Sequence, residues 1–313
     1  MSVVNQNAQS TALTPKMVQQ MIVSALSALR LQGDPFDMWW VIFAIRLNHT
    51  MSDASGLVQF MMALGEMARG AHAPSVQPVW QRELLNARDP PHVLCVHHEF
   101  DKIKNTNQTA LTPLPDLVGR SFFFGPKEVS ALRKHLPPHL RMSSTTFEVL
   151  TACLWRCRTI ALNPDPNEIV RLTVIVNARN RFRPPLPVGY YGNACSTPTV
   201  LSTARKLCES PVEYALGLVK ETKTVVTDEY MRSLADLIVI RGRPNFTLVG
   251  CAYVVSNVSR SGLKDVDFGW GKAVYGGPSA VGPEASTYSA ATAKERKGLW
   301  CRWAYPGPLW KYL

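Results

Sequence analysis

The sequence has no apolar run long enough to cross a bilayer and no pattern of a secretory leader. Its longest apolar run, residues 38–45, falls well short of the roughly 20 residues that a membrane-spanning helix needs. The first residues lack the basic start and apolar core of a signal peptide. We therefore expect a cytoplasmic protein with no membrane partner.

Paired cysteine spacing is also missing, because the seven cysteines are scattered along the chain. An odd number in this arrangement argues against a disulfide framework and fits a reducing compartment. No C-x-x-C pair occurs, and the adjacent His97 and His98 have no evident co-ligands. We therefore expect no bound metal.

Acidic residues are few relative to basic ones: 34 Lys and Arg against 23 Asp and Glu give a formal net charge of +11. Such an excess suits nucleic acid, a membrane surface or an anionic small ligand. The basic residues are dispersed, and part of the excess lies in the last twenty residues. A nucleic-acid partner is therefore the weakest of these interpretations.

What the sequence does contain is material for a core, since 46% of its 313 residues are hydrophobic and 18% are charged. This length suits about two domains and argues against disorder. Helical and extended patterns alternate, which predicts an α/β arrangement. Helices are expected at 17–31, from Ser52 or Asp53 to 67, and at 126–135, 149–161 and 212–226, and strands at 38–47, 93–96, 121–124, 172–176 and within 248–256. The Pro-rich stretch from 73 to 115 is expected to connect two domains.

His49 is the sharpest candidate for chemistry, because it lies between a predicted strand and a predicted helix. Ligands of α/β sheets usually bind where strands end, and histidine is the side chain whose ordinary pKa suits a general base at neutral pH. Asp53 follows four residues later and can cap the helix. On this spacing alone, a structural histidine and a simple helix cap stay the stronger alternatives.

A second constellation is the glycine-rich stretch that contains Asp267, Phe268, Gly269, Trp270 and Gly271. Glycines allow tight turns, and the two aromatic rings can pin such a loop. The stretch matches neither phosphate-binding glycine pattern. We therefore interpret it as a structural hairpin or turn.

Four stretches together carry a family resemblance: L-N-H-T-M-S-D at 47–53, V-N-A-R-N-R at 176–181, P-P-L-P-V-G-Y-Y-G-N-A at 184–194 and V-D-F-G-W-G-K-A-V-Y-G-G-P at 266–278. On these motifs the sequence resembles the plant BAHD acyl-CoA-dependent acyltransferases. The detail is most similar to the branch that esterifies volatile or benzyl-type alcohols. The similarity extends from about residue 36 to 283.

The resemblance implies an α/β fold of two chloramphenicol-acetyltransferase-like domains, with mixed sheets flanked by helices and with the first domain incomplete. Residues 1–75 would be the remnant of the N-terminal domain with H-x-x-x-D. Residues 76–117 would be the crossover linker, and residues 118–313 the C-terminal domain with D-F-G-W-G. Residues 284–313 depart from the family pattern, which suggests a reading-frame artefact or a truncated paralogue.

The resemblance also implies a reaction. His49 would take the proton from the hydroxyl of a small alcohol, which attacks the thioester of acyl-CoA in a ternary complex to form an ester. Asp53 would support the site by pairing with Arg179, and Ser256 could donate to the oxyanion. Asp267 to Gly271 would lie away from the base and shape the fold or the CoA side.

Further roles implied by the resemblance concern the co-substrate. Thr146, Asn193 and Ala194 match regions that line the CoA channel, although residue by residue a helix cap and a turn stay the stronger interpretations. No cofactor is expected beyond acyl-CoA as co-substrate, and the chain would act as a monomer without nucleic acid. The alternative is a catalytically impaired paralogue that only binds CoA or another protein.

Overall fold

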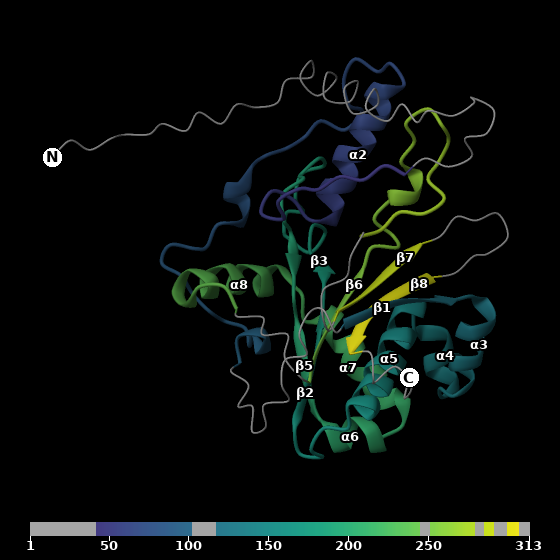
Figure 1. Ribbon diagram of the computed structural model, residues 1–313. Helices are drawn as coiled ribbons and strands as arrows, with labels where there is room; N and C mark the ends of the chain where they lie inside the picture. The colour runs from purple at the N-terminus through teal and green to yellow at the C-terminus, as the bar shows by residue number, and fades with distance from the viewer. Residues whose placement is uncertain (1–41, 102–116, 245–250, 279–284, 291–298, 307–313) are drawn as a thin grey trace.

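The computed structural model describes residues 42–101, 117–244, 251–278, 285–290 and 299–306, and its centre is a six-stranded sheet (Figure 1). The strand order is β1-β8-β7-β6-β2-β5. β6 runs parallel to β2 and β7, and the other neighbours are antiparallel. The strands are β1 (Leu117–Phe124), β2 (Ile169–Val174), β5 (Thr199–Thr203), β6 (Ala252–Asn257), β7 (Ala285–Ala290) and β8 (Leu299–Pro306), and a separate pair is formed by β3 (Val176–Asn177) and β4 (Cys195–Ser196).

Helices surround this mixed sheet. In Figure 1, α2 lies at the upper end, α8 lies to the left, and α3 to α7 gather at the lower right. The helices are α2 (Ala54–Ala68), α3 (Pro126–Lys134), α4 (Pro138–Ser143), α5 (Thr146–Leu162), α6 (Ala204–Glu209), α7 (Val212–Thr224) and α8 (Asp228–Arg241), with short 3-10 turns η1 (Arg82–Leu85), η2 (His98–Phe100) and η4 (Leu263–Asp265). A mixed sheet flanked by helices confirms the predicted fold class.

The hydrophobic core lies where α5 and α7 pack against the sheet. Trp155 and Leu150 of α5 are fully buried, as are Leu172 of β2 and Leu216 of α7. The sequence starts α5 with a capping box: Glu148 N donates to Thr145 Oγ1 at 3.3 Å, and Thr145 N donates to Glu148 Oε2 at 2.8 Å. This reciprocal pair satisfies two backbone donors that the first helical turn leaves free.

Long periodic segments match the predictions well. The helices expected at 126–135, 149–161 and 212–226 are α3, α5 and α7, and the helix after Asp53 is α2. The strand at 121–124 is the end of β1, and the pattern at 172–176 is divided between β2 and β3. The helix expected at 17–31 lies outside the described residues.

Two expected strands are wrong. Residues 42–47 have no regular structure, and Ile42 is 85% exposed, because no described strand pairs with this apolar segment. The rest of that prediction, residues 38–41, lies outside the described residues. Residues 93–96 are irregular because Leu94 N and Cys95 N donate to Ser233 Oγ of α8, at 3.1 and 3.0 Å, instead of to a strand.

Strands β7 and β8 fall in residues 284–313, where the sequence was expected to depart from the family pattern, and they complete the sheet. β8 lies between β1 and β7 and is antiparallel to both. The proposed frame-shift or truncation stays a prediction. The division of the chain at residues 75 and 117 also stays a prediction. Within the described ranges, no helix combines the length and hydropathy that crossing a membrane requires.

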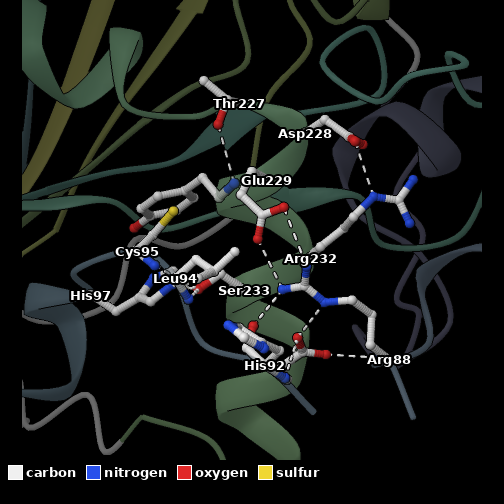
Figure 2. A network of polar contacts seen from close by, with 12 residues as sticks. Arg88, His92, Leu94, Cys95, His97, Thr227, Asp228, Glu229, Arg232 and Ser233 are labelled. Atoms are coloured by element: carbon white, nitrogen blue, oxygen red, sulfur yellow. Dashed lines mark hydrogen bonds and ion pairs between the residues drawn. The ribbon is translucent and has the colours of Figure 1, made fainter. Parts of the chain in front are cut away.

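The described part of the connector is fastened to α8 (Figure 2). Arg88 Nε donates to Asp236 Oδ2 at 2.7 Å, and Arg88 Nη2 lies 2.9 Å from Glu229 Oε1. Burial acts to raise the pKa of the Asp236 carboxyl, but hydrogen bonds from His92 N and Arg88 outweigh it and lower that pKa. Ion pairing therefore holds this irregular segment where no strand forms.

Candidate active site

The site begins with the N-terminus of α2. Asp53 has extended backbone angles and accepts hydrogen bonds from Ser55 N at 3.0 Å and Gly56 N at 3.1 Å through Oδ1. These bonds satisfy two of the amide groups that a helix leaves free at its start. The helix-cap interpretation of Asp53 is therefore correct, although it is not the whole role of this side chain.

Arg179 reaches the same carboxylate from the other side. Its Nη1 donates to Asp53 Oδ2 and its Nη2 to Asp53 Oδ1, both at 2.8 Å. Ala194 N and the Cys195 thiol donate to Oδ2 at 3.0 and 3.1 Å. A planar guanidinium matches a carboxylate in this two-bond geometry. The pair that the resemblance implied is thus present as a two-bond ion pair.

Burial and hydrogen bonding compete at this carboxylate. Asp53 is 4% exposed, and burial acts to raise its pKa. The hydrogen bonds from Arg179 and Ala194 outweigh burial, so the pKa of Asp53 lies below its ordinary value. Burial and the adjacent Asp53 carboxylate raise the pKa of the Cys195 thiol to about 12. Asp53 is therefore ionised at neutral pH, and Cys195 keeps the proton that it donates.

The motif at 184–194 wraps around this ion pair. Arg179 also donates to the carbonyl oxygens of Tyr190 and Gly192, at 3.2 and 2.6 Å. The loop approaches α2 so closely that a Cβ on Gly56 would lie 1.9 Å from Tyr191 O. Only glycine permits such an approach.

His49 lies four residues before Asp53, in an exposed turn. The turn is closed by a bond from Met51 N to Asn48 O at 3.0 Å. Asn193 Nδ2 donates to the carbonyl oxygen of His49 at 2.7 Å. His49 is exposed, and no described residue hydrogen-bonds its imidazole.

A cavity of about 750 Å³ lies at the ends of β2 and β6, beside the N-termini of α3 and α5. Its polar wall includes Asn177, whose Nδ2 donates to Ser55 Oγ of α2 at 3.0 Å and whose Oδ1 accepts from Arg179 N at 3.1 Å. The first turn of α2 therefore contacts the cavity rim through Asn177. The apolar wall includes Phe124, Val129, Phe147, Val174 and Leu299.

Positive charge gathers around this cavity. Arg133, Arg181, Lys223 and Arg260 line it, whereas no Asp or Glu is among its described lining residues. The Lys223 ammonium pairs with Glu148. Three guanidinium groups beside apolar walls suit an anionic ligand with an apolar portion. Sequence analysis missed this group, because the four cations are far apart in the chain.

The structure separates the three residues that were expected to line a CoA channel. Thr146 lines the large cavity, and the helix cap there is its neighbour Thr145. Asn193 and Ala194 instead line a second hollow of about 140 Å³, and both bond to the H-x-x-x-D segment. Ser256 is half-buried in β6, beside Asn257, which lines the large cavity.

The glycine-rich motif forms a turn at the other end of α2. Asp267 Oδ1 accepts from Gly269 N at 2.7 Å and from Gly271 N at 3.1 Å, and both glycines have positive φ. Arg69, just after α2, donates to the Asp267 carbonyl. Since α2 has 15 residues at about 1.5 Å each, the motif lies on the order of 20 Å from the His49 end. The Phe268 and Trp270 rings lie 6.0 Å apart within this turn.

A buried cluster beside α8 contains a serine, a histidine and a glutamate, the residue types of a catalytic triad. His97 Nε2 lies 3.0 Å from Ser233 Oγ, and His97 Nδ1 lies 3.2 Å from Glu99 Oε1, which also accepts from Tyr230 OH. Ser233 is fully buried and already accepts two backbone N–H groups from the connector. A substrate cannot reach this hydroxyl, so the cluster holds the connector and is not a catalytic triad.

Metal ligands are not grouped in the part of the chain that the structure describes: no cluster of three His, Cys, Asp or Glu side chains could hold an ion. All seven cysteines lie in described segments as free thiols.

Comparison with known proteins gives the family. The model of the Transferase family matches residues 6–299, a wider range than the expected 36–283. The chain belongs to this family, the BAHD acyltransferases that its motifs resemble.

Curated relatives agree with this membership. Benzyl alcohol O-benzoyltransferase of Petunia hybrida is 66% identical over 241 residues, which is 77% of this chain and 52% of that protein. The protein of the same name from Nicotiana tabacum is 64% identical, again over 77% of this chain and 52% of that protein. An alcohol acyl transferase of Malus domestica is 52% identical over 76% of this chain and 52% of its own length. The chain thus spans about half the length of these relatives.

Solved structures show the same fold. Vinorine synthase matches with a TM-score of 0.60 and 18% identity, over 85% of this chain and 59% of that one. TRI101 of F. graminearum, complexed with coenzyme A and deoxynivalenol, matches with a TM-score of 0.59 and 16% identity, over 83% of this chain and 62% of that one.

Proposed function

We propose that this chain transfers an acyl group from acyl-CoA to the hydroxyl of a small alcohol and forms an ester. The observation that carries the proposal is the position of His49: an accessible imidazole lies in a turn next to the Asp53–Arg179 pair, which contacts the rim of the cationic cavity through Asn177. The names of the relatives, benzyl alcohol O-benzoyltransferase and alcohol acyl transferase, support the choice of acceptor.

In the proposed reaction, His49 accepts the proton of the alcohol while the oxygen attacks the thioester carbonyl. The resulting tetrahedral intermediate expels the CoA thiolate, which takes the proton back from the imidazolium. Both substrates are bound together, and no covalent enzyme intermediate forms. The thioester is already activated, so the reaction needs no metal or other cofactor. A positioned base of this kind contributes about 10²–10⁴-fold in rate.

The large cavity is the proposed place for acyl-CoA. Phosphate groups suit the guanidinium groups of Arg133, Arg181 and Arg260, and the apolar walls suit the rest of the molecule. Thr146 at the start of α5 lines the same cavity and is the proposed polar contact from that helix. Ser256 is the proposed donor to the oxyanion. In this proposal the chain acts in the cytoplasm as a monomer, with acyl-CoA and alcohol as its partners.

The test is incubation of the full 313-residue chain with benzoyl-CoA and benzyl alcohol, with the release of free thiol as the readout. We expect turnover in the wild type and a loss of about 10²–10⁴-fold in His49→Ala. His72→Ala is the matched control, because His72 is exposed beyond the other end of α2.

Two outcomes oppose the proposal. Equal rates for wild type and His49→Ala would show that His49 is not the base. Calorimetric binding of CoA without any thiol release, over a panel of acyl-CoAs and alcohols, would instead favour the CoA-binding paralogue without turnover.

A further inference from the structure

The turn that contains His49 is shaped by local bonds but is not fixed by them. Asn48 Oδ1 accepts from Thr50 N at 3.0 Å and from Thr50 Oγ1 at 2.9 Å. All residues of this turn are exposed. Because no described residue hydrogen-bonds the imidazole of His49, its orientation depends on how the backbone of the turn is held.

Two side chains from distant parts of the chain hold that backbone. Asn193 Nδ2 donates to the carbonyl of His49 at 2.7 Å. Arg82 Nη1 donates to the carbonyl of Thr50 at 3.4 Å, and Nη2 donates to the carbonyl of Met51 at 2.5 Å. Three successive carbonyl oxygens are therefore bound by donors that lie outside the turn.

Arg82 is itself held in place by aromatic rings. Its guanidinium carbon lies 4.0 Å from the centre of the Trp80 ring and 5.8 Å from that of Tyr191. The two rings lie 5.4 Å apart. A planar guanidinium can stack its face on a ring while its edge donates hydrogen bonds in a fixed fork, whereas an ammonium has no planar face to stack. The fork is thus preorganised before it meets the turn.

We propose that Asn193 and Arg82 are positioning residues for His49: they fix the catalytic imidazole by holding the carbonyl oxygens of its turn. The inference rests on the proposed function, since it assumes that His49 is the base. It gives Asn193 a role toward the protein, where the family resemblance implied a role toward CoA. It also assigns a role to Arg82, which no motif contained.

The test compares steady-state kinetics of Asn193→Asp and Arg82→Met with the wild type. Asn193→Asp keeps the shape but replaces the donor, and Arg82→Met keeps the aliphatic stem. A misplacement of about 1 Å can cost roughly 10²-fold, so we expect kcat to fall about 10- to 100-fold in each. The KM for acyl-CoA should stay within about twofold, because neither residue touches the cationic cavity in this scheme.

Controls separate positioning from general damage. Asn167→Ala and Arg205→Met change exposed residues outside the site and should keep wild-type kcat. In a His49→Ala background, Asn193→Asp and Arg82→Met should cause no further loss. A further fall in kcat in the His49→Ala background would overturn the inference in favour of direct substrate contact. A raised KM with unchanged kcat in the single variants would do the same. Arg82→Lys keeps the positive charge and a donor group but not the planar fork, so its kcat should lie between those of wild type and Arg82→Met, which covers the case that Arg82→Met does not fold.

Hydrogen exchange gives a readout that does not need turnover. We expect the amides of residues 49–52 to exchange at least tenfold faster in Asn193→Asp and Arg82→Met, with the melting temperature close to that of wild type. If the wild type shows no transferase activity, the proposed function fails, and this measurement still decides whether the two side chains hold the turn. Unchanged exchange in both variants would overturn the inference.

Discussion

Arg179→Met tests whether the ion pair with Asp53 is a structural necessity of the site. The substitution removes both 2.8 Å bonds to a carboxylate that is 4% exposed, together with the bonds to the carbonyls of Tyr190 and Gly192. Breaking a buried pair by removing one partner leaves an uncompensated charge and costs about 3–5 kcal/mol. Against a typical total stability of about 5–15 kcal/mol, such a loss is large.

The assay is urea unfolding at pH 7, with Arg232→Met as the control. Arg232 pairs with Asp228 at 3.0 Å, but the two side chains are 39% and 26% exposed. An exposed pair contributes about 0–1 kcal/mol, so the control should change the free energy of unfolding little. If the free energy of unfolding falls by the same amount in both variants, within about 1 kcal/mol, the claim that burial makes the Asp53 pair more stabilising than an exposed pair is refuted.

The pH dependence gives the same reasoning a second readout. The pKa of Asp53 is lowered in the folded protein, so its ionised form stabilises the fold above its unfolded pKa of about 4. That contribution is lost as the pH falls through the lower folded pKa. In Arg179→Met, the guanidinium no longer offsets burial, and protonation of Asp53 should relieve the unpaired charge. The stability gap between wild type and variant should therefore narrow below about pH 4, and a gap that widens there would contradict the assignment.

Three further predictions concern single side chains. Ser256→Ala should lower kcat by about 10²–10³-fold if the hydroxyl donates to the oxyanion, as measured by thiol release, and an unchanged kcat removes Ser256 from the reaction. Gly56→Ala would place a Cβ 1.9 Å from Tyr191 O, and overpacking of this kind costs about 1–3 kcal/mol, visible as a lower urea midpoint. Cys195, whose pKa is raised to about 12, should resist iodoacetamide at pH 8, whereas the exposed Cys157 reacts first in a peptide-mapping time course. Rapid labelling of Cys195 would show that its thiol is not held by Asp53.

Local sequence patterns predicted the elements whose stability is local. The capping box at Thr145 and the proline at the first turn of α3 mark helix starts by bonds within a few residues, and both helices begin there. The apolar run at 38–47 misled for the opposite reason. Its composition fits a strand, but a strand needs a neighbour, and nothing in the run shows whether one is present.

The candidate site was only partly predictable for a related physical reason. His49, Asp53 and Arg179 belong to recurring residue patterns, so they can be recognised in the sequence. Arg82 acts through backbone carbonyl oxygens, which every residue has, and such contacts impose no residue type on the turn that they hold.

The geometry also decides how the two named residues of H-x-x-x-D relate to each other. A carboxylate beside a histidine commonly orients the imidazole, but Asp53 already receives six donors, from Ser55 N, Gly56 N, two nitrogens of Arg179, Ala194 N and the Cys195 thiol. These donors surround both carboxylate oxygens, and no hydrogen bond among the described residues joins Asp53 to the imidazole. The carboxylate therefore builds the frame in which the turn is held, and in the proposed function His49 would act as a base without a carboxylate partner. Its orientation then has to come from the carbonyl contacts of the turn, which is why the loss of Asn193 or Arg82 should affect kcat rather than the binding of acyl-CoA.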